Sequence, residues 1–361
     1  MLDNIKFKIT EQQIINRMTT QPNFEYYLKR DEKGRVMNCY HSLKHKTFGS
    51  KLSLDFTKVI DNGELIGYSD VQIIISPHYH FNQYHHNGND FTPENCINSV
   101  SDILTYIGIK PNEYEDLKVV NLEFGLNLIP DAEIKTIING LLFSKRTKFI
   151  VPDTKYPYSK KTDSTDYKRL KAYAKGLQFI EAPEYGIHPN TFRFEIKTKE
   201  AKYLRTDKIR IYNATDLLNL DVYSRLGQIL LNEWETVLIT NAKPDVTNLK
   251  SNDVKFINQA KNIDFWNKMI PKKKTQRQIT QNETTQPKYR NKFSRYKQKY
   301  YKILGKNNNL HTQIKLHIID KLFSLQSGAN STQTTPTNKG NIQSVKITHP
   351  LLNLETAPLF L

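Results

Sequence analysis

Apolar and polar side chains alternate in several short segments between residue 1 and about residue 240. These segments are rich in Val, Ile, Phe and Tyr, and a period of two residues is typical of strands with one buried face. We predict strands at residues 6–10, 50–60, 70–81, 117–129, 145–152, 168–176 and 191–199. Segments with helical spacing lie between them, so the pattern predicts an α+β fold: an antiparallel sheet with packed helices.

Three helices are predicted between these strands. One begins after Thr92, since Thr92 can cap the first turn, Pro93 suits the first helical position and Glu94 faces the helix dipole. It is expected to continue to about Ile107. The other two cover residues 131–143 and 221–240. The apolar stripe of the last helix is expected to pack as core.

Two of the predicted strands resemble each other in carrying a single glutamate. "VNLEFGLNLI" contains Glu123 and "FRFEIKTK" contains Glu195, which hints at duplicated half-units. Each carboxylate lies on the face opposite its immediate neighbours, where it could reach a cleft or a metal ion. The alternative for each is an ordinary solvent-facing glutamate.

Beyond residue 240 the composition changes to Lys, Gln, Asn and Thr. Thirteen Lys or Arg residues lie between Lys268 and Lys306 against one acid, Glu283, with tyrosines and Phe293 interleaved. The candidate nucleic-acid contacts are Lys272, Lys273, Lys274, Arg290, Arg295, Lys297 and Lys299. The alternative is a solvated charge run that raises affinity for DNA without specificity.

The composition therefore divides the chain into three parts. We predict a catalytic domain at 1–240, a basic and aromatic nucleic-acid-binding region at 241–323, and a disordered tail at 324–361. The tail contains "SLQSGANSTQTTPTNKGN", which has too few large apolar groups to offset the entropy lost on folding.

Charge and cysteine content indicate the class of partner and the compartment. Lys and Arg number 53 against 36 Asp and Glu, a formal charge of +17 that suits a polyanion such as nucleic acid. The two cysteines, Cys39 and Cys96, favour a reducing compartment. Neither a signal peptide nor a membrane span is recognisable, so we expect a cytoplasmic protein without membrane contact.

The segment "IISPHYHFNQYHHNGNDF" contains four of the ten histidines, and these four span only nine residues. If the strand ending this apolar run continues through His78 and His80, both imidazoles share one face and could bind a divalent metal. His85 and His86 follow in a turn, where a histidine is usually polar surface. A zinc site of four histidines is a weaker alternative, since no paired cysteines accompany it.

Several segments, in order, resemble the gene II/X type of replication initiator from small phages and plasmids, particularly Bacteroidetes forms. They are "HHNGNDFTPENC", "NLEFGLNLI", "LKAYAKGLQ", "NTFRFEIKTK" and "ATDLLN", and the resemblance covers roughly residues 70 to 240. Such initiators are similar to HUH endonucleases, in which two histidines around a bulky residue bind a metal and a tyrosine cuts single-stranded DNA. His78-Tyr79-His80 fits that pattern.

The resemblance implies an enzyme of rolling-circle replication that nicks and rejoins origin DNA. A tyrosine hydroxyl would attack a phosphodiester, leaving a 5′-phosphotyrosine and a free 3′-OH. The implied cofactor is a divalent ion, Mg²⁺ or Mn²⁺, and the implied partners are single-stranded and supercoiled origin DNA with a host helicase and polymerase. The alternatives are a non-catalytic, sequence-specific DNA-binding protein and an RNA-binding protein with stacking aromatics.

Tyr173 is the first candidate for the nucleophile, because "KAYAKG" matches the family's Tyr-x-Lys-Gly segment. Lys171 and Lys175 alternate with Tyr173, so all three could face one side, and Lys175 is the second catalytic candidate. Tyr158 and Tyr167 remain alternatives because basic residues follow each of them.

The candidate metal ligands are His78, His80, Glu123 and Glu195. His80 matches the family's more characteristic histidine, so His80 with the two glutamates is an alternative set.

Overall fold

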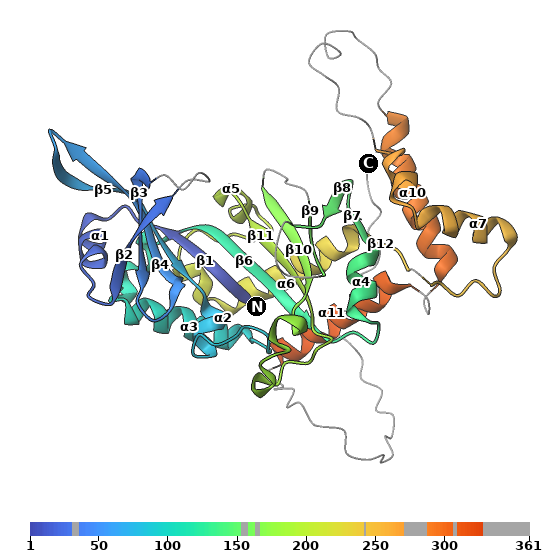
Figure 1. The fold of residues 1–361 in the computed structure, drawn as a ribbon, viewed down its shortest axis with the longest axis horizontal. Helices are drawn as coiled ribbons and strands as arrows, with labels where there is room; N and C mark the ends of the chain where they lie inside the picture. The colour runs from blue at the N-terminus through green and yellow to red at the C-terminus, as the bar shows by residue number, and fades with distance from the viewer. Residues whose placement is uncertain are drawn as a thin grey trace, which may run out of the picture. The chain divides into compact units, whose positions relative to one another are not determined.

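The structure is a computed structural model that describes residues 1–30, 36–152, 158–162, 167–241, 243–270, 287–305 and 309–327. In these residues an antiparallel sheet of twelve strands runs in the order β12-β7-β8-β9-β10-β11-β6-β1-β5-β4-β3-β2. Helices pack against it (Figure 1), which confirms the predicted α+β fold. The strands are β1 (Leu2–Lys8), β2 (Phe24–Arg30), β3 (Val36–His45), β4 (Gly49–Asp61), β5 (Glu64–Ile75), β6 (Lys118–Leu128), β7 (Leu141–Ser144), β8 (Thr147–Ile150), β9 (Ser159–Thr162), β10 (Lys168–Ala174), β11 (Phe192–Thr198) and β12 (Val237–Ile239).

The helices of the described residues vary from single turns to five turns. The α-helices are α1 (Gln12–Thr19), α2 (Pro77–Phe81), α3 (Pro93–Tyr106), α4 (Ile134–Gly140), α5 (Ala201–Leu204), α6 (Leu220–Thr236), α7 (Ser251–Ala260), α8 (Ile263–Asn267), α10 (Pro287–Leu304) and α11 (Leu310–Gln326). The 3₁₀-helices are η1 (Pro111–Asp116), η2 (Gly176–Phe179), η3 (Pro183–Tyr185) and η4 (Thr215–Leu218).

The strand order is similar on the two sides of the pair β1 and β6, with β12 added beyond β7 on one side. Outward from β1 the strands are β5, β4, β3 and β2, and outward from β6 they are β11, β10, β9, β8 and β7. In each half the first strand pairs with the last, and a helix follows the first strand: α1 in one half and α4 in the other. The order gives two half-units, but Glu123 of β6 and Glu195 of β11 both lie in the second of them, on neighbouring strands, so they are not equivalent positions of two halves as predicted.

The three predicted helices are present, and two of them, α4 and α6, end several residues earlier than predicted. The N-cap of α3 is as predicted, because Thr92 Oγ1 accepts a hydrogen bond of 3.2 Å from the Asn95 amide. α4 and α6 each give way to a short strand, β7 and β12, and these two strands pair with each other. Their apolar residues fit either structure, and pairing across the sheet edge decides for strand.

The histidine segment differs from the prediction of a continued strand. β5 ends at Ile75 and Pro77 begins α2, in which the His80 amide donates to the Ser76 carbonyl at 3.0 Å. Proline has no N–H for a strand ladder but suits the first helical turn, so the chain turns here. His78 and His80 therefore do not share a strand face.

The apolar face of the sheet packs against α3, α6 and α11, which form the main hydrophobic core with it. Trp234 of α6 contacts Phe194 of β11 edge to face, with ring centroids 5.2 Å apart. The Trp234 indole donates to the His311 carbonyl at 2.9 Å, which fastens α11 to α6. Part of the chain beyond residue 241 thus belongs to the main core.

The other helices beyond residue 241 have a core of their own. Phe256, Trp266, Phe293 and Tyr300 are buried there, from α7, α8 and α10. The residue pattern of this basic region predicts no helices, because charged residues hide the spacing of its aromatic ones. α11 also continues past Ser324, where the disordered tail was predicted to begin. Lys272, Lys273, Lys274 and the tail from residue 328 lie outside the described residues.

Candidate active site on the polar face of the sheet

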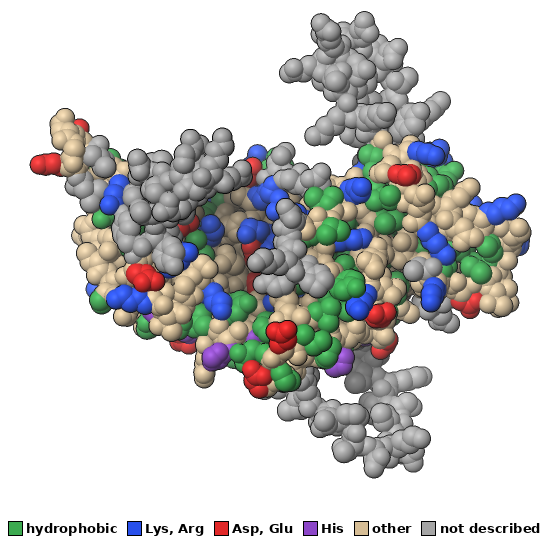
Figure 2. Space-filling view, viewed as in Figure 1, with side chains coloured by type: hydrophobic (Ala, Val, Ile, Leu, Met, Phe, Trp, Pro, Cys, Tyr) green, Lys and Arg blue, Asp and Glu red, His purple; other side chains and the backbone are tan. Residues whose placement is uncertain are grey.

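The face of the sheet opposite the main core carries a row of charged side chains. In β11, Phe192, Phe194 and Ile196 are buried among apolar residues, and the alternate positions are Arg193, Glu195 and Lys197. Register continues the row: Glu195 is opposite Lys171 of β10, and Lys197 is opposite Glu123 of β6. Acidic and basic side chains gather next to each other at the middle of this face (Figure 2).

Glu195 lies at the centre of the row and contacts three side chains. The Tyr173 hydroxyl donates to Glu195 Oε2 at 3.0 Å, and Arg193 Nε donates to the same oxygen at 2.9 Å. Lys171 Nζ lies 2.8 Å from Glu195 Oε1. Burial alone would raise the pKa of Glu195, but Lys171 and Arg193 outweigh burial and lower it, so the carboxylate stays ionised.

Lys171 joins the two predicted glutamates. Its Nζ lies 2.9 Å from Glu123 Oε2, and Lys197 forms a second ion pair with the other oxygen of Glu123. Burial would lower the pKa of Lys171, but the two carboxylates raise it above its usual value. One ammonium group therefore occupies the position between two carboxylates, which is where a divalent cation with oxygen ligands would also bind.

Gly125 allows Glu195 to approach β6 this closely. A Cβ atom at position 125 would lie 2.5 Å from Glu195 Cβ and 2.5 Å from the Phe194 carbonyl oxygen, far inside van der Waals contact. Only glycine leaves room for the Glu195 side chain at this position, where β6 and β11 pair.

Tyr173 is partly buried and has a pKa well above its ordinary value. Burial is the first cause, and the Glu195 carboxylate is the second because it opposes a phenolate. The ground state is thus a neutral hydroxyl whose proton already points at an ionised carboxylate. The hydrogen bond places the proton that Tyr173 would lose on attack within reach of a carboxylate.

Lys175 lies just beyond β10 and is 2% exposed. Its Nζ lies 5.7 Å from the centre of the Tyr173 ring and donates to Gln178 at 3.0 Å. Burial first, and Arg193 second, lower the pKa of Lys175 to about 8. Lys175 therefore does not continue the alternation of Lys171 and Tyr173, but it lies beside the Tyr173 ring.

Arg193 connects this row to β1. Arg193 Nη2 lies 2.8 Å from Asp3 Oδ2, and Arg193 Nη1 donates to Asn127 Oδ1 at 2.8 Å. A register shift between Leu2 and Asn4 places Asp3 at a bulge of β1. Burial would raise the pKa of Asp3, but Arg193, His78 and Lys175 together outweigh burial and lower it, so Asp3 is an anion.

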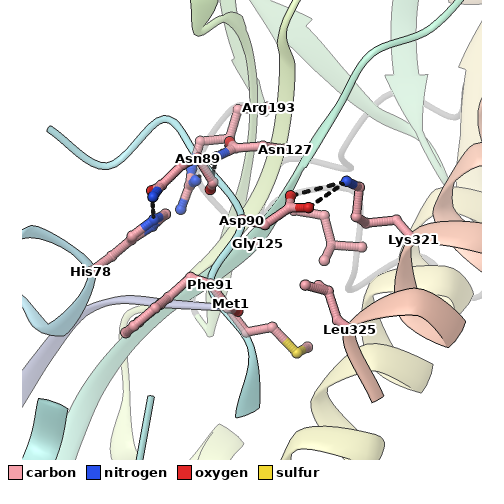
Figure 3. A pocket seen from close by; sticks show the side chains of 11 residues that line it. Met1, His78, Asn89, Asp90, Phe91, Gly125, Asn127, Arg193, Lys321 and Leu325 are labelled. Carbon is pink, nitrogen blue, oxygen red and sulfur yellow. Dashed lines mark hydrogen bonds and ion pairs between the residues drawn. The ribbon is translucent and has the colours of Figure 1, made fainter. Parts of the chain in front are cut away.

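His78 is buried on the other side of Asp3. Its Nε2 is 2.9 Å from Asn89 Oδ1, and its Nδ1 is 3.7 Å from Asp3 Oδ1. Its ring stacks on Phe91 at 4.5 Å, and burial lowers its pKa to about 4. Figure 3 shows His78 directed at Asn89, while Arg193 meets Asn127 behind it.

His80 takes a different direction from His78. Its Nδ1 lies 3.2 Å from the Tyr84 hydroxyl, and it is only partly buried. The structure therefore brings Glu123 and Glu195 together and separates the two histidines from each other. Among the described residues, no group of three or more His, Cys, Asp or Glu side chains is arranged to hold a metal ion. A two-histidine site would need α2 to rearrange.

The second histidine pair packs on aromatic rings. The His86 ring lies 4.8 Å from Tyr185 and 6.1 Å from Phe179, and the exposed His85 lies 6.0 Å from Tyr185. These contacts join the loop after α2 to the loop after β10. The expected role as polar surface fits His85.

The side chains of the alternative tyrosines take other directions, although the Tyr158 carbonyl accepts a hydrogen bond of 3.0 Å from the Ala174 amide. Tyr158 packs against the main core with Lys135 of α4 over its ring at 5.1 Å. Tyr167 is 46% exposed and lines a cavity of about 310 Å³ that Glu233 of α6 also lines. Of the three candidates, Tyr173 is the one that a carboxylate and two cations surround.

The predicted nucleic-acid contacts of α10 separate into two groups. Arg295 and Lys299 are exposed. Lys297 is partly buried: its Nζ donates to the Glu235 carbonyl at 2.7 Å, and burial lowers its pKa to about 8. Arg290 lies within α10, and its side chain is outside the described part of the structure.

Asp3, Asn127 and Arg193 are site residues that the sequence pattern does not predict. Arg193 had a signal, since it alternates with Phe192 and Phe194 as Glu195 does. Asp3 had none, because its role depends on the pairing of β1 with β6.

The comparisons with known proteins identify no relative from which site residues could be transferred. The chain matches no protein-family model, no curated protein and no solved structure. Each helix that the structure describes is too short or too polar to cross a lipid bilayer.

Proposed function

We propose that this protein is a rolling-circle replication initiator that nicks and rejoins origin DNA with Tyr173 as the nucleophile. The observation that carries the proposal is the hydrogen bond from the Tyr173 hydroxyl to Glu195, inside a row that also contains Lys171 and Arg193. A nucleophile, a proton acceptor and cations for a phosphate thus meet on one sheet face.

The chemistry is a transesterification. The Tyr173 oxygen attacks the scissile phosphorus as its proton passes to Glu195, and the bond to the 3′ oxygen of the preceding nucleotide breaks. The departing 3′ oxygen takes up a proton, so the products are a 5′-phosphotyrosine and a 3′-OH. Attack by a 3′-OH on the phosphotyrosine reverses the step and rejoins DNA, since one ester replaces another.

The cations of the site offset the charge of the transferring phosphate. Lys171 and Arg193 flank Glu195, and Lys175 lies over the Tyr173 ring. A pKa of about 8 leaves Lys175 largely an ammonium ion at neutral pH. Preorganised cations in a site shielded from water stabilise the transition state more than solvated ones do.

Glu123 and Glu195 fit a divalent ion by chemistry and spacing. Both carboxylates lie within 2.9 Å of one Lys171 Nζ atom, and carboxylate oxygens suit Mg²⁺ or Mn²⁺. When bound, the ion would polarise the phosphoryl oxygen and reduce its charge. Lys171 would then turn toward the phosphate, because both cannot occupy the same position.

The biological setting is part of the proposal. We assign the substrate to single-stranded or supercoiled origin DNA of a phage or plasmid, in the host cytoplasm, with a host helicase and polymerase extending the 3′-OH. The support is the sequence resemblance together with a formal charge of +17.

A cleavage assay tests the proposal. Purified protein is incubated with labelled supercoiled and single-stranded DNA from its own replicon, with Mn²⁺, Mg²⁺ or chelator, and resolved on denaturing gels. Peptide mapping should find DNA attached to Tyr173. Tight binding to origin DNA without any nick would contradict the proposal that this protein is an enzyme.

The second candidate is a non-catalytic, sequence-specific DNA-binding protein. Its support is the bridging of both glutamates by Lys171, which also describes a structural ion-pair network. The same assay separates the two, because this candidate binds origin DNA and leaves its phosphodiesters intact.

A further inference from the structure

α10 carries an exposed row of basic side chains that the candidate active site does not use. Lys292, Arg295, Lys299 and Lys302 are all exposed and are spaced three, four and three residues apart. Residues at this spacing share one face of a helix. We call these four residues the basic stripe. α10 contains no acidic residue, and in the described part of the chain none of the four forms an ion pair.

Aromatic residues of α10 beside the stripe pack on α7 and α8; Phe293 and Tyr300 are buried and Tyr296 is partly buried. Phe293 and Tyr300 contact Trp266 of α8, with ring centroids 5.4 and 6.2 Å apart. Tyr296 contacts Phe256 of α7 at 5.7 Å. These contacts fix the orientation of α10, so the basic stripe is directed at solvent by packing rather than by chance.

The burial of these rings decides which nucleic acid suits the stripe. Proteins that bind single strands combine a basic groove with exposed aromatic rings on which bases stack. Tyr301 is engaged as well, since its hydroxyl bonds to the Val237 carbonyl and the Ile239 amide. The partly buried Tyr296 contacts Phe265 at 5.9 Å, and Lys292 Nζ lies 5.7 Å from its ring centre, so this ring is also engaged within the protein. Charge therefore dominates recognition by the stripe.

We propose that the basic stripe binds the phosphate backbone of double-stranded DNA. Ten residues separate Lys292 from Lys302, about 15 Å along the helix at about 1.5 Å per residue. That length matches about four to five base pairs at about 3.4 Å each. The inference extends the proposed function by one partner: the sheet face takes the strand to be cut, and α10 holds the flanking duplex.

Lys297 is excluded from the stripe although the charge run includes it. Its Nζ bonds to the Glu235 carbonyl, and its ammonium is partly buried beside Tyr301. Lys292 and Lys302, conversely, belong to the stripe through exposure and spacing alone.

Fluorescence anisotropy of the full-length protein tests the inference, in chelator so that no cleavage occurs. The probes are a duplex of about 20 base pairs, one of its single strands and an RNA of the same sequence, over a range of salt concentrations. The stripe variant changes Lys292, Arg295, Lys299 and Lys302 to Ala. Since each phosphate contact contributes about 0.9 to the salt slope, we expect the slope for the duplex to fall by about three to four and affinity at least about ten-fold.

A matched control separates position from net charge. Changing Lys46, Lys110, Lys202 and Lys208 to Ala removes the same charge from exposed positions scattered over other elements. An equal loss of duplex affinity in this control would overturn the inference. So would a larger loss for the single strand or the RNA than for the duplex. Because cleavage is not measured, failure of the nicking chemistry leaves this result unaffected.

Discussion

The Tyr173 hydroxyl donates a hydrogen bond of 3.0 Å to the Glu195 carboxylate. Their strands β10 and β11 are adjacent, and Tyr173 is opposite Arg193, so the tyrosine reaches Glu195 diagonally across the pair. Diagonal neighbours on one sheet face are within reach of a long aromatic side chain. The contact therefore follows from register, and changes to either residue test the site directly.

Replacing Tyr173 by Phe should abolish the covalent DNA adduct and lower nicking by about three orders of magnitude or more, because among the described residues no other tyrosine side chain contacts the charged row. Loss of one hydrogen bond should change the free energy of unfolding by only about 1 kcal/mol. Tyr158→Phe and Tyr167→Phe are the matched controls. An adduct that persists in Tyr173→Phe but disappears in either control would move the nucleophile.

Glu123→Gln should raise the metal concentration needed for half-maximal nicking at least about ten-fold, because an amide is a weaker ligand than a carboxylate. DNA binding, measured by anisotropy in chelator, should change much less. Glu184→Gln, at an exposed position on η3, controls for the charge change. An unchanged metal requirement in Glu123→Gln would remove Glu123 from the metal site.

Gly125→Ala should destabilise the protein by about 1 to 3 kcal/mol, because the new methyl group overlaps Glu195 Cβ and the Phe194 carbonyl. Nicking per folded molecule should fall as well, since Glu195 is displaced from Tyr173. Thermal melts and active-site titration measure the two effects. Gly67→Ala is the control, as a Cβ atom there meets no atom within 4 Å.

Arg193→Met should cost about 3 to 5 kcal/mol of unfolding free energy, because it leaves the buried Asp3 carboxylate without its cation. The double variant with Asp3→Asn should recover part of that loss. Urea denaturation of the four proteins gives the coupling energy. Additive losses would show that Asp3 and Arg193 do not interact.

Lys175→Met should stabilise the protein near neutral pH. Its pKa falls from 10.5 unfolded to about 8 folded, which corresponds to about 3 kcal/mol. The unfolded chain binds more protons between these values, so wild-type stability rises with pH there. The advantage of Lys175→Met should therefore be largest below about pH 8 and shrink toward pH 10.5. Melting temperatures over pH 6 to 10.5 check this, and a constant difference would contradict it.

Several features could be predicted from local sequence. The cap at Thr92 gave the start of α3, because the side-chain and backbone groups involved lie within one turn. The single glutamates of β6 and β11 lie on the polar face, as their alternation with apolar residues indicates. The segment "KAYAKG" singled out Tyr173 as the candidate nucleophile, and in the structure Tyr173 lies beside Glu195 and Lys175.

Other features were wrong or out of reach. The strand through His78 and His80 was wrong because Pro77, which cannot donate to a ladder, turns the chain into α2. The helices beyond residue 241 were missed because the aromatic spacing of α10 lies within a charge run. Burial of Phe293 and Tyr300 shows that part of this run is core.

The sequence by itself determined that the central strands have one apolar and one polar face, and which side chains share a face, because alternation depends only on residues two positions apart. Only the tertiary structure decided which strands are neighbours. Pairing of β1 with β6 and of β6 with β11 brings Asp3, Glu123 and Arg193 into one row although long stretches of chain separate them. The pairing depends on burying the whole apolar face at once beneath α3, α6 and α11, which no local pattern specifies.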